Sequence, residues 1–181
     1  MTELKKHLLK LSEEIVINSD RLDEIEFEEQ SSERFEIFRS LRSIGDELLE
    51  LIENANPDAD DRAFAQFALG SVCALLGYYD KAEAAYDEAL AHWPDHVGIL
   101  NEATDVLVEL GYFQKAKRFI QRSIKHGGET PDMLYNLASV TAHIGDTAEA
   151  RIILINTLAK FPHDAGCRAL LEELDKASSV N

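Results

Sequence analysis

The stretch that decides the fold is LGSVCALLGYYDKAEAAYDEALAHWP, residues 69–94. Small residues at Gly70 and Ala82 allow two helices to approach closely, and the bulky Tyr86 fills the space beside that contact. Gly77 lies between the two apolar segments. A glycine takes up the left-handed conformation that ends a helix at no steric cost. The stretch therefore predicts two helices joined by a tight turn.

The same pattern recurs further along the chain at intervals of 34 residues. A large aliphatic residue precedes each glycine of the pattern, and an alanine follows it by five residues. The repeated positions are the glycines Gly77, Gly111 and Gly145, the alanines Ala82, Ala116 and Ala150, and the bulky residues Tyr86, Ile120 and Leu154. Sequence periods of this length indicate stacked helical hairpins that bury a continuous core. Three units are predicted, over residues 63–96, 97–130 and 131–164.

These positions resemble the tetratricopeptide repeat family. The first unit matches the family pattern at Leu69, Gly70, Ala82, Tyr86, Ala89 and Pro94. It departs from the pattern at Gln66 and Cys73, where the family usually has Trp and Tyr, and Ala103 and Thr104 replace the Leu-Gly pair in the second unit. The resemblance implies an all-α fold, a right-handed α-solenoid of three helix-turn-helix units over residues 63–164, with helices added at both ends.

The flanking segments are predicted to be helical as well. Residues 165–181 are expected to form a capping helix and a short tail, and residues 1–62 an acidic helical segment with helices near 3–17 and 32–54. The helix near 32–54 is expected to bury the apolar stripe Phe35, Phe38, Leu41, Ile44, Leu48 and Leu51. A degenerate repeat over 26–59 is an alternative to simple helical capping of the stack.

The first 30 residues leave three arrangements open. They can pack back on the repeats, form an arm that joins two copies of the chain, or move independently. The acidic segment 20–30 is either a short helix or a hinge.

Several residues are expected to cap helices. Asp80 and Asp146 each precede a glutamate by three residues, a pattern that resembles a capping box. Thr130, which a proline follows, predicts an N-cap and a first-turn proline. Asp95 and Asp164 stand shortly after prolines and are expected to mark the starts of the next helices.

The composition indicates a globular protein with a strong negative charge. Hydrophobic residues make up 45% and charged residues 29% of the chain, and 18 basic against 34 acidic side chains give a net charge of −16. Such a charge repels nucleic acid and anionic lipid and favours a basic or apolar partner. No apolar run is long enough to span a membrane, and no secretory signal is recognised. Cys73 and Cys167 are expected to be buried thiols of a cytoplasmic protein.

No pattern predicts catalysis, a metal site or a cofactor. His92 and His96 are four residues apart, but Pro94 lies between them and should break the helix that such a metal site needs. Phosphate-binding glycine loops and nucleophile motifs are missing from the sequence. Paired carboxylates on exposed helical faces are expected to be solvated. The sequence therefore predicts a protein that is not an enzyme.

The family resemblance implies a peptide-binding groove formed by the first helix of each unit. Carried over residue by residue, it contains Phe64, Phe67, Ser71, Asn101, Asp105, Tyr135, Asn136, Ser139 and His143. Asn101 and Asn136 can hydrogen-bond an extended backbone, whereas Phe67 and Tyr135 either form side-chain pockets or belong to the core. Family members that grip an acidic C-terminus use groove lysines and arginines. This face has none, so the expected ligand is apolar or basic.

A basic stripe on the second helix of the second unit contrasts with the acidic chain. It consists of Lys115, Arg118, Arg122 and Lys125, and is expected either to be solvated or to bind an acidic partner. Three functions fit these features: a scaffold or adaptor that captures a segment of another protein, a small acidic secretion-type chaperone for exported proteins, and a self-assembling structural protein that uses its N-terminal arm.

Overall fold

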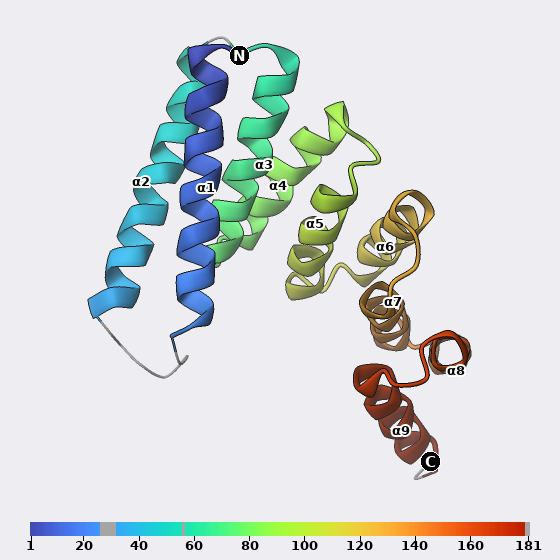
Figure 1. Ribbon diagram of the computed structural model, residues 1–181. Coiled ribbons are helices and arrows are strands. Elements are labelled where there is room, and N and C mark those ends of the chain that lie inside the picture. The colour runs from blue at the N-terminus through green and yellow to red at the C-terminus, as the bar shows by residue number, and fades with distance from the viewer. Residues whose placement is uncertain (26–31, 56, 180–181) are drawn as a thin grey trace. The chain divides into compact units, whose positions relative to one another are not determined.

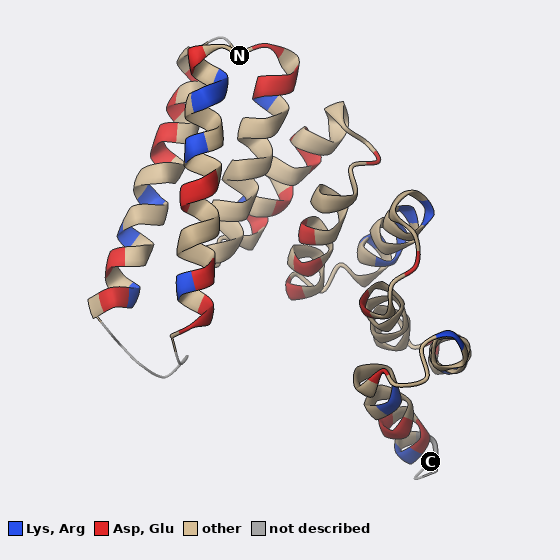
Figure 2. Cartoon of the chain, in the orientation of Figure 1, with Lys and Arg blue, Asp and Glu red and all other residues tan. Residues whose placement is uncertain are grey.

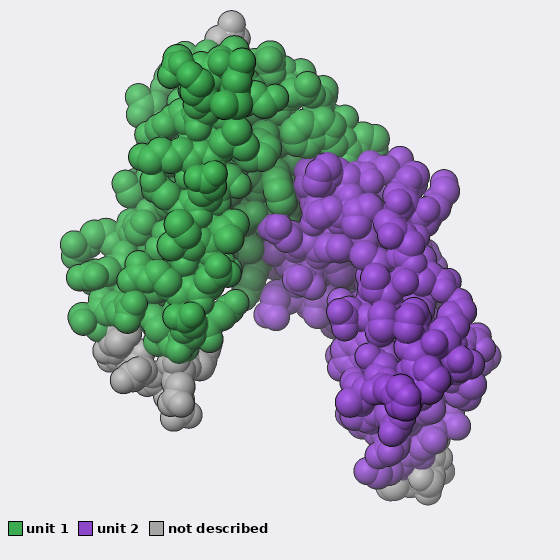
Figure 3. Space-filling view, in the orientation of Figure 1, with its two compact units in different colours: residues 1–94 green, residues 95–181 purple. Residues whose placement is uncertain are grey.

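The computed structural model describes residues 1–25, 32–55 and 57–179, and every regular element in these ranges is a helix (Figure 1). The chain divides into two compact units, Met1–Pro94 and Asp95–Asn181 (Figure 3). Unit 1 contains α1 (Glu3–Asp23), α2 (Ser32–Asn54), α3 (Ala59–Leu75) and α4 (Tyr79–His92). Unit 2 contains α5 (Val97–Glu109), α6 (Phe113–Gly127), α7 (Pro131–His143), α8 (Thr147–Lys160) and α9 (Ala165–Ser179). The predicted all-α fold of helix-turn-helix units is confirmed.

The same turn joins α3 to α4, α5 to α6 and α7 to α8. Its glycines Gly77, Gly111 and Gly145 have φ angles of 75°, 72° and 96°, in the left-handed region that the sequence predicts. In the first turn the Tyr78 N–H donates to the Cys73 carbonyl at 2.8 Å. This bond spans the end of the helix as in a Schellman motif, so each turn satisfies carbonyls that the helix end leaves unpaired.

The first helix packs back on the rest of unit 1. α1 contacts both α2 and α3, and its side chains Leu8, Leu11 and Ile15 are buried. His7 Nε2 lies 2.7 Å from a carboxylate oxygen of Glu47 on α2. The helix extends to Asp23, beyond the predicted end near residue 17, whereas residues 26–30 of the acidic segment 20–30 lie outside the described residues.

α2 spans the predicted range 32–54, and its buried face contains the centre of the predicted stripe but not all of its members. Ile37 and Ile52 are buried with Leu41, Ile44 and Leu48, whereas Phe35 is 63% exposed. The Phe35 ring lies instead beside Arg39, whose guanidinium carbon is 5.0 Å from the ring centroid. The centre of the predicted stripe is therefore confirmed, while Phe35 at its start lies on the exposed side of the helix.

α1 and α2 together form a long hairpin in which both helices contact α3. The helices α7 and α8 make the corresponding pair of contacts with α9. The segment before the first repeat therefore packs as a hairpin over residues 3–54. A degenerate repeat over 26–59 is not what the structure shows, because that range holds one continuous helix in its described part up to Asn54.

Unit 2 ends in the predicted capping helix. Ala138, Leu154 and Cys167 form a buried cluster that joins α7, α8 and α9. Leu170, Leu171 and Leu174 of α9 pack against this cluster. The opposite side of α9 carries exposed acidic residues, so the last helix closes the apolar core of the unit with a polar face (Figure 2).

The helix starts agree with three of the predicted caps and correct two others. The side chains of Thr130, Asp146 and Asp164 accept hydrogen bonds from the backbone N–H groups three residues ahead of them. α4 begins after Tyr78, which forms no side-chain cap, so Asp80 lies in the first turn rather than at the N-cap. His96, not Asp95, caps α5 through its Nδ1 atom.

Asp95 instead forms ion pairs with Arg122 and His126 of α6, at 3.4 and 3.5 Å.

No described helix combines the length and the low polarity needed to cross a bilayer.

Candidate functional site

Three of the predicted groove residues line one cavity in unit 2. Asn101 and Asp105 of α5 and Asn136 of α7 face a cavity of about 210 Å³, which we call the α5–α7 cavity. Thr104, Ile120, Thr130, Asp132 and Met133 complete its lining. Side chains carried by separate repeats therefore converge on one small concave site.

Each of the two helices contributes an amide and a carboxylate, one helical turn apart. Asn101 precedes Asp105 by four residues on α5, and Asp132 precedes Asn136 by four residues on α7. Residues four apart lie on the same face of a helix, so each pair points to the same side. The cavity therefore combines hydrogen-bonding amides with negative charge.

Both asparagine side chains have amide groups available to a ligand. The Ser123 hydroxyl donates to Asn101 Oδ1 at 2.5 Å, which directs the Asn101 amide nitrogen, a donor, away from this bond. Among the described residues, the Asn136 side chain has no hydrogen-bond partner. An extended backbone has donors and acceptors that both amides can satisfy.

The electrostatics of the cavity are negative. Partial burial, followed by the nearby charges of Glu102 and Glu109, raises the pKa of Asp105. These neighbours disfavour the ionised form of Asp105 because like charges repel. Figure 2 shows the acidic residues of α5 and the basic residues of α6 on separate helices. A positively charged group near Asp105 would relieve the repulsion among the three carboxylates.

The other predicted residues of α7 lie outside the cavity lining. Tyr135 is half-buried and packs against the cluster that α7 forms with α8 and α9. The His143 ring stacks on Phe113 with the ring centroids 4.8 Å apart, and its Nδ1 atom donates to the Ser139 carbonyl at 2.8 Å. Tyr135 thus supports the α9 contact, while His143, whose ring nitrogen donates to the Ser139 carbonyl, lies against Phe113 at the start of α6.

In unit 1 the predicted residues of α3 divide between two surroundings. Phe67 lies 6.1 Å from the Tyr86 ring, centroid to centroid, and Ser71 accepts a hydrogen bond of 3.5 Å from the Tyr86 hydroxyl. Phe64 lines a separate cavity of about 200 Å³ together with Lys5 and Leu9 of α1. Because α1 packs on α3, Phe64 lies close to Lys5 and Leu9, and the repeat pattern alone does not predict these neighbours.

Sequence reasoning missed Asp132 and Met133 of the cavity lining. Asp132 has a detectable signal, because it stands one helical turn before Asn136 in the first turn of α7. Met133 has none beyond its position on the helix. The cavity depends on side chains from α6 as well, where Ile120 was assigned only to the repeat core.

The basic stripe of α6 is partly engaged within unit 2. Lys115 and Arg122 lie 5.5 and 5.6 Å from the centroid of the Phe119 ring, and Arg122 also pairs with Asp95. Lys117, beside the stripe, forms an ion pair of 2.6 Å with Glu149. Part of the positive charge of α6 is therefore engaged in contacts within unit 2.

A comparison with known protein families supports the repeat pattern seen in the sequence. Residues 63–105 match the family model described as Tetratricopeptide repeat. The resemblance seen in the sequence is thus confirmed over residues 63–105. No curated protein sequence matches the chain significantly.

Solved structures of tetratricopeptide repeat proteins share the fold at low sequence identity. MamA of Desulfovibrio magneticus RS-1, residues 41 to the end, is 13% identical with a TM-score of 0.72 over 99% of this chain and 88% of that one. The Arabidopsis OM64 TPR domain is 14% identical with a TM-score of 0.58, over 66% of this chain and 98% of that one. YrrB, described as a TPR protein with an unusual peptide-binding site, is 19% identical with a TM-score of 0.55, over 70% and 62% of the two chains.

Proposed function

We propose that the protein is an interaction scaffold or adaptor that captures a basic polypeptide segment of another protein in the α5–α7 cavity. The observation that carries this proposal is the convergence of Asn101, Asp105 and Asn136 on one cavity, with Asp132 beside them. Two amides can hold a peptide backbone, and two carboxylates can hold a lysine or arginine side chain.

The lining of the cavity also sets its selectivity. None of the described residues that line it is a lysine or an arginine, so an acidic segment would find no cation there. Glu102 and Glu109 add to the negative potential around Asp105. Electrostatic complementarity of this kind selects partners and speeds their association more than it adds affinity.

Apolar side chains give the same cavity a second type of contact. Ile120 and Met133 belong to the lining, and a methionine side chain adapts its shape to different ligands. A segment that places an aliphatic residue next to a lysine or arginine would use both parts of the site. This combination agrees with the apolar or basic ligand expected from the sequence.

The class of protein supports an interaction role but does not identify the partner. YrrB, which has the same fold, is described as having a peptide-binding site. Fold alone does not define function, so the chemistry of the partner rests on the side chains of the cavity. A groove that runs along all three repeats remains a prediction, since the two units are described separately.

Selection of short random peptides displayed on phage against the full chain tests the proposal. We expect a consensus rich in lysine or arginine that disappears when the selection is repeated with Asp105→Lys. Glu50→Lys is the matched control, because it makes the same charge change on an exposed position of α2 in the other unit. The control should keep the wild-type consensus.

Calorimetry with one selected peptide then checks the role of the amides. Asn101→Ala combined with Asn136→Ala should weaken binding about tenfold or more, since each lost hydrogen bond costs about 1 kcal/mol. A consensus rich in acidic residues that depends on Asp105, or binding unchanged by all these substitutions, would contradict the proposal.

A further inference from the structure

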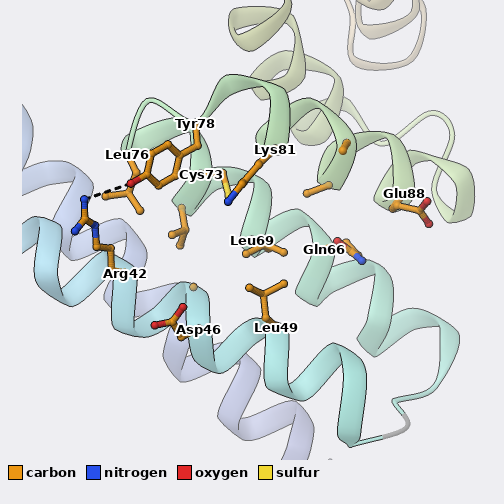
Figure 4. A pocket seen from close by; sticks show the side chains of 14 residues that line it. Arg42, Asp46, Leu49, Gln66, Leu69, Cys73, Leu76, Tyr78, Lys81 and Glu88 are labelled. Atoms are coloured by element: carbon orange, nitrogen blue, oxygen red, sulfur yellow. Dashed lines mark hydrogen bonds between the residues drawn. The ribbon is translucent and has the colours of Figure 1, made fainter.

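Unit 1 contains a larger cavity on a face that the α5–α7 cavity does not involve. A groove of about 610 Å³ runs between α2 and α4 over α3, and we call it the α2–α4 groove (Figure 4). Its floor includes Leu69 and Cys73 of α3 and the C-cap residue Leu76, which are spaced four and three residues apart. The floor thus follows one face of α3 over about two helical turns, roughly 10 Å.

The middle of the groove walls is formed by apolar and mostly small residues. Gly45 and Leu49 of α2 form one wall, and Ala84 and Ala85 of α4 form the other. Leu49 is 44% exposed, so its side chain contributes apolar surface to the groove rather than to the core. Side chains this short leave the space between α2 and α4 open, which explains why the groove exists where consecutive hairpins would otherwise close it.

The thiol of Cys73 is buried in the floor of the groove, and its pKa reflects this burial. Burial raises the pKa of Cys73, and the charge of Lys81 acts in the opposite direction. The Lys81 ammonium group is therefore close enough to the floor to influence its electrostatics.

Two cations and a tyrosine stand together at one end of the groove. Arg42 Nη2 donates to the Tyr78 hydroxyl at 3.3 Å, and Lys81 Nζ lies 5.4 Å from the centroid of the Tyr78 ring. Neither Arg42 nor Lys81 pairs with a carboxylate in the described part of the chain. In a protein with a net charge of −16, two cations without an acidic partner are available for an external carboxylate.

The opposite end of the groove has a different character. Figure 4 shows Glu88 and Gln66 at that end, away from Arg42 and Tyr78. The groove therefore has an apolar middle with Arg42 and Lys81 at one end and Glu88 at the other, while Asp46 lies on the α2 wall between Arg42 and Leu49. A ligand that fills it should carry a negative group on one side of an apolar stretch.

The shape and polarity of the walls favour a helical ligand over an extended one. An extended segment brings unpaired backbone N–H and C=O groups, and the apolar middle of the groove offers them few partners. A helix satisfies its own backbone hydrogen bonds and presents only side chains to the groove. The amide-lined α5–α7 cavity has the opposite preference, which separates the two sites by the chemistry of their ligands.

We propose that the α2–α4 groove binds an amphipathic helix of a partner protein, which seats apolar side chains over Leu69 and Cys73 and directs an acidic side chain to Arg42 and Lys81. The partner is acidic, in contrast to the basic segment proposed for the α5–α7 cavity. The two sites are distinct, because their lining residues do not overlap.

The test uses a fluorescent helical peptide of about 18 residues, long enough to form a helix. Its leucines are spaced four and three residues apart, and glutamates flank them. A second peptide replaces the glutamates by lysines, and a third carries a proline in the middle, which breaks the helix. Fluorescence anisotropy measures the binding of each peptide to the full chain. We expect the acidic helix to bind at least about tenfold more tightly than either of the other two.

Variants of the groove locate the binding. Ala84→Trp fills the groove from an exposed position of α4 and should abolish binding, while circular dichroism confirms that the fold persists. Arg42→Gln with Lys81→Gln should weaken binding about tenfold and remove the preference for glutamate over lysine. Arg39→Gln is the matched control on α2, because Arg39 lies beside Phe35 and does not line the groove.

Several outcomes would overturn the assignment. These are no binding of the acidic helix, equal binding of the proline peptide, binding that Ala84→Trp leaves intact, and a dimer of the wild-type chain that Ala84→Trp dissociates. The last result would assign the groove to a second copy of the chain. Asp105→Lys should leave the acidic helix bound, so failure of this site and failure of the α5–α7 cavity are distinguishable.

Discussion

Gly70 and Tyr86 lie in such close contact that a β-carbon on Gly70 would be 2.5 Å from Cε1 of the Tyr86 ring. The ring cannot retreat, since Tyr86 is only 1% exposed. Gly70→Ala should therefore lower the free energy of unfolding by about 1–3 kcal/mol through overpacking, even though alanine is the better helix former by about 1 kcal/mol. Urea or thermal unfolding of the purified chain measures this loss.

A second glycine provides the control for this measurement. A β-carbon on Gly166 of α9 would meet its nearest neighbours, Asp164 and Tyr135, at 3.6 Å, an ordinary van der Waals distance. Gly166→Ala should be neutral or slightly stabilising. If Gly70→Ala is equally harmless, then α3 and α4 do not pack as closely as the structure shows.

The alanines of the repeat pattern should be equally sensitive to size. Ala82 and Ala150 are both 0% exposed, where the second helices of the first and third hairpins meet their neighbours. Ala82→Leu or Ala150→Leu should cost about 1–3 kcal/mol of unfolding free energy. Ala91→Leu, on an exposed position of α4, is the control and should stay within about 0.5 kcal/mol. An unchanged melting temperature for Ala82→Leu would show that the contact is looser than described.

Repeated local signals made the hairpins predictable, and isolated ones were less reliable. The turn at Gly77 recurs at Gly111 and Gly145, and all three have positive φ angles. A single aspartate after a tyrosine is weaker evidence: Asp80 was expected to cap α4, but the helix begins after Tyr78. The preceding turn, in which the Tyr78 N–H donates to the Cys73 carbonyl, leads directly into α4 and leaves Asp80 within its first turn.

The candidate sites were predictable only where they follow the repeat. Asn101, Asp105 and Asn136 share the α5–α7 cavity because they occupy related faces of equivalent helices. The neighbour of Phe64 on α1 and the whole α2–α4 groove were not predicted. Both depend on how a hairpin outside the repeat pattern packs on α3, which is a tertiary contact without a periodic signal in the sequence.

The threonine cap of α7 should contribute measurably to stability. The Thr130 hydroxyl accepts a hydrogen bond of 3.2 Å from the Met133 N–H at the start of that helix. Thr130→Ala leaves this N–H without its side-chain acceptor and should cost about 1 kcal/mol of unfolding free energy. Thr130→Ser keeps the hydroxyl and should cost much less. Equal losses for the two variants would mean that the hydroxyl does not act as the cap.

The two thiols should resist modification in the folded protein. Burial, together with the nearby Asp164 carboxylate, raises the pKa of Cys167 to about 12, and burial also raises the pKa of Cys73. Since the thiolate is the reactive form, Cys167 should have a thiolate fraction about a thousandfold below that of an ordinary cysteine. Ellman's reagent at pH 8 should label both thiols rapidly in denaturant and slowly in the native protein. Rapid native labelling of Cys73→Ser, which retains only Cys167, would contradict this expectation.

The carboxylate that caps α9 should make stability depend on acidic pH. The Cys167 N–H donates to Asp164 at 2.7 Å, and this backbone hydrogen bond, followed by one from the Cys167 side chain, lowers the pKa of Asp164 from 3.8. A carboxyl group whose pKa is lower in the folded state stabilises the fold above 3.8, and that stabilisation disappears as the pH falls through 3.8 to the folded value.

Asp164→Asn isolates this effect, because asparagine also caps helices but does not titrate in this range. The other carboxyl groups of the chain are present in both proteins, so their contributions cancel in the difference. The melting temperature of the wild type minus that of the variant should be greatest near neutral pH and should shrink steadily below about pH 5. A difference that stays constant from neutral to acidic pH would show that Asp164 gains nothing from its charge at the start of α9.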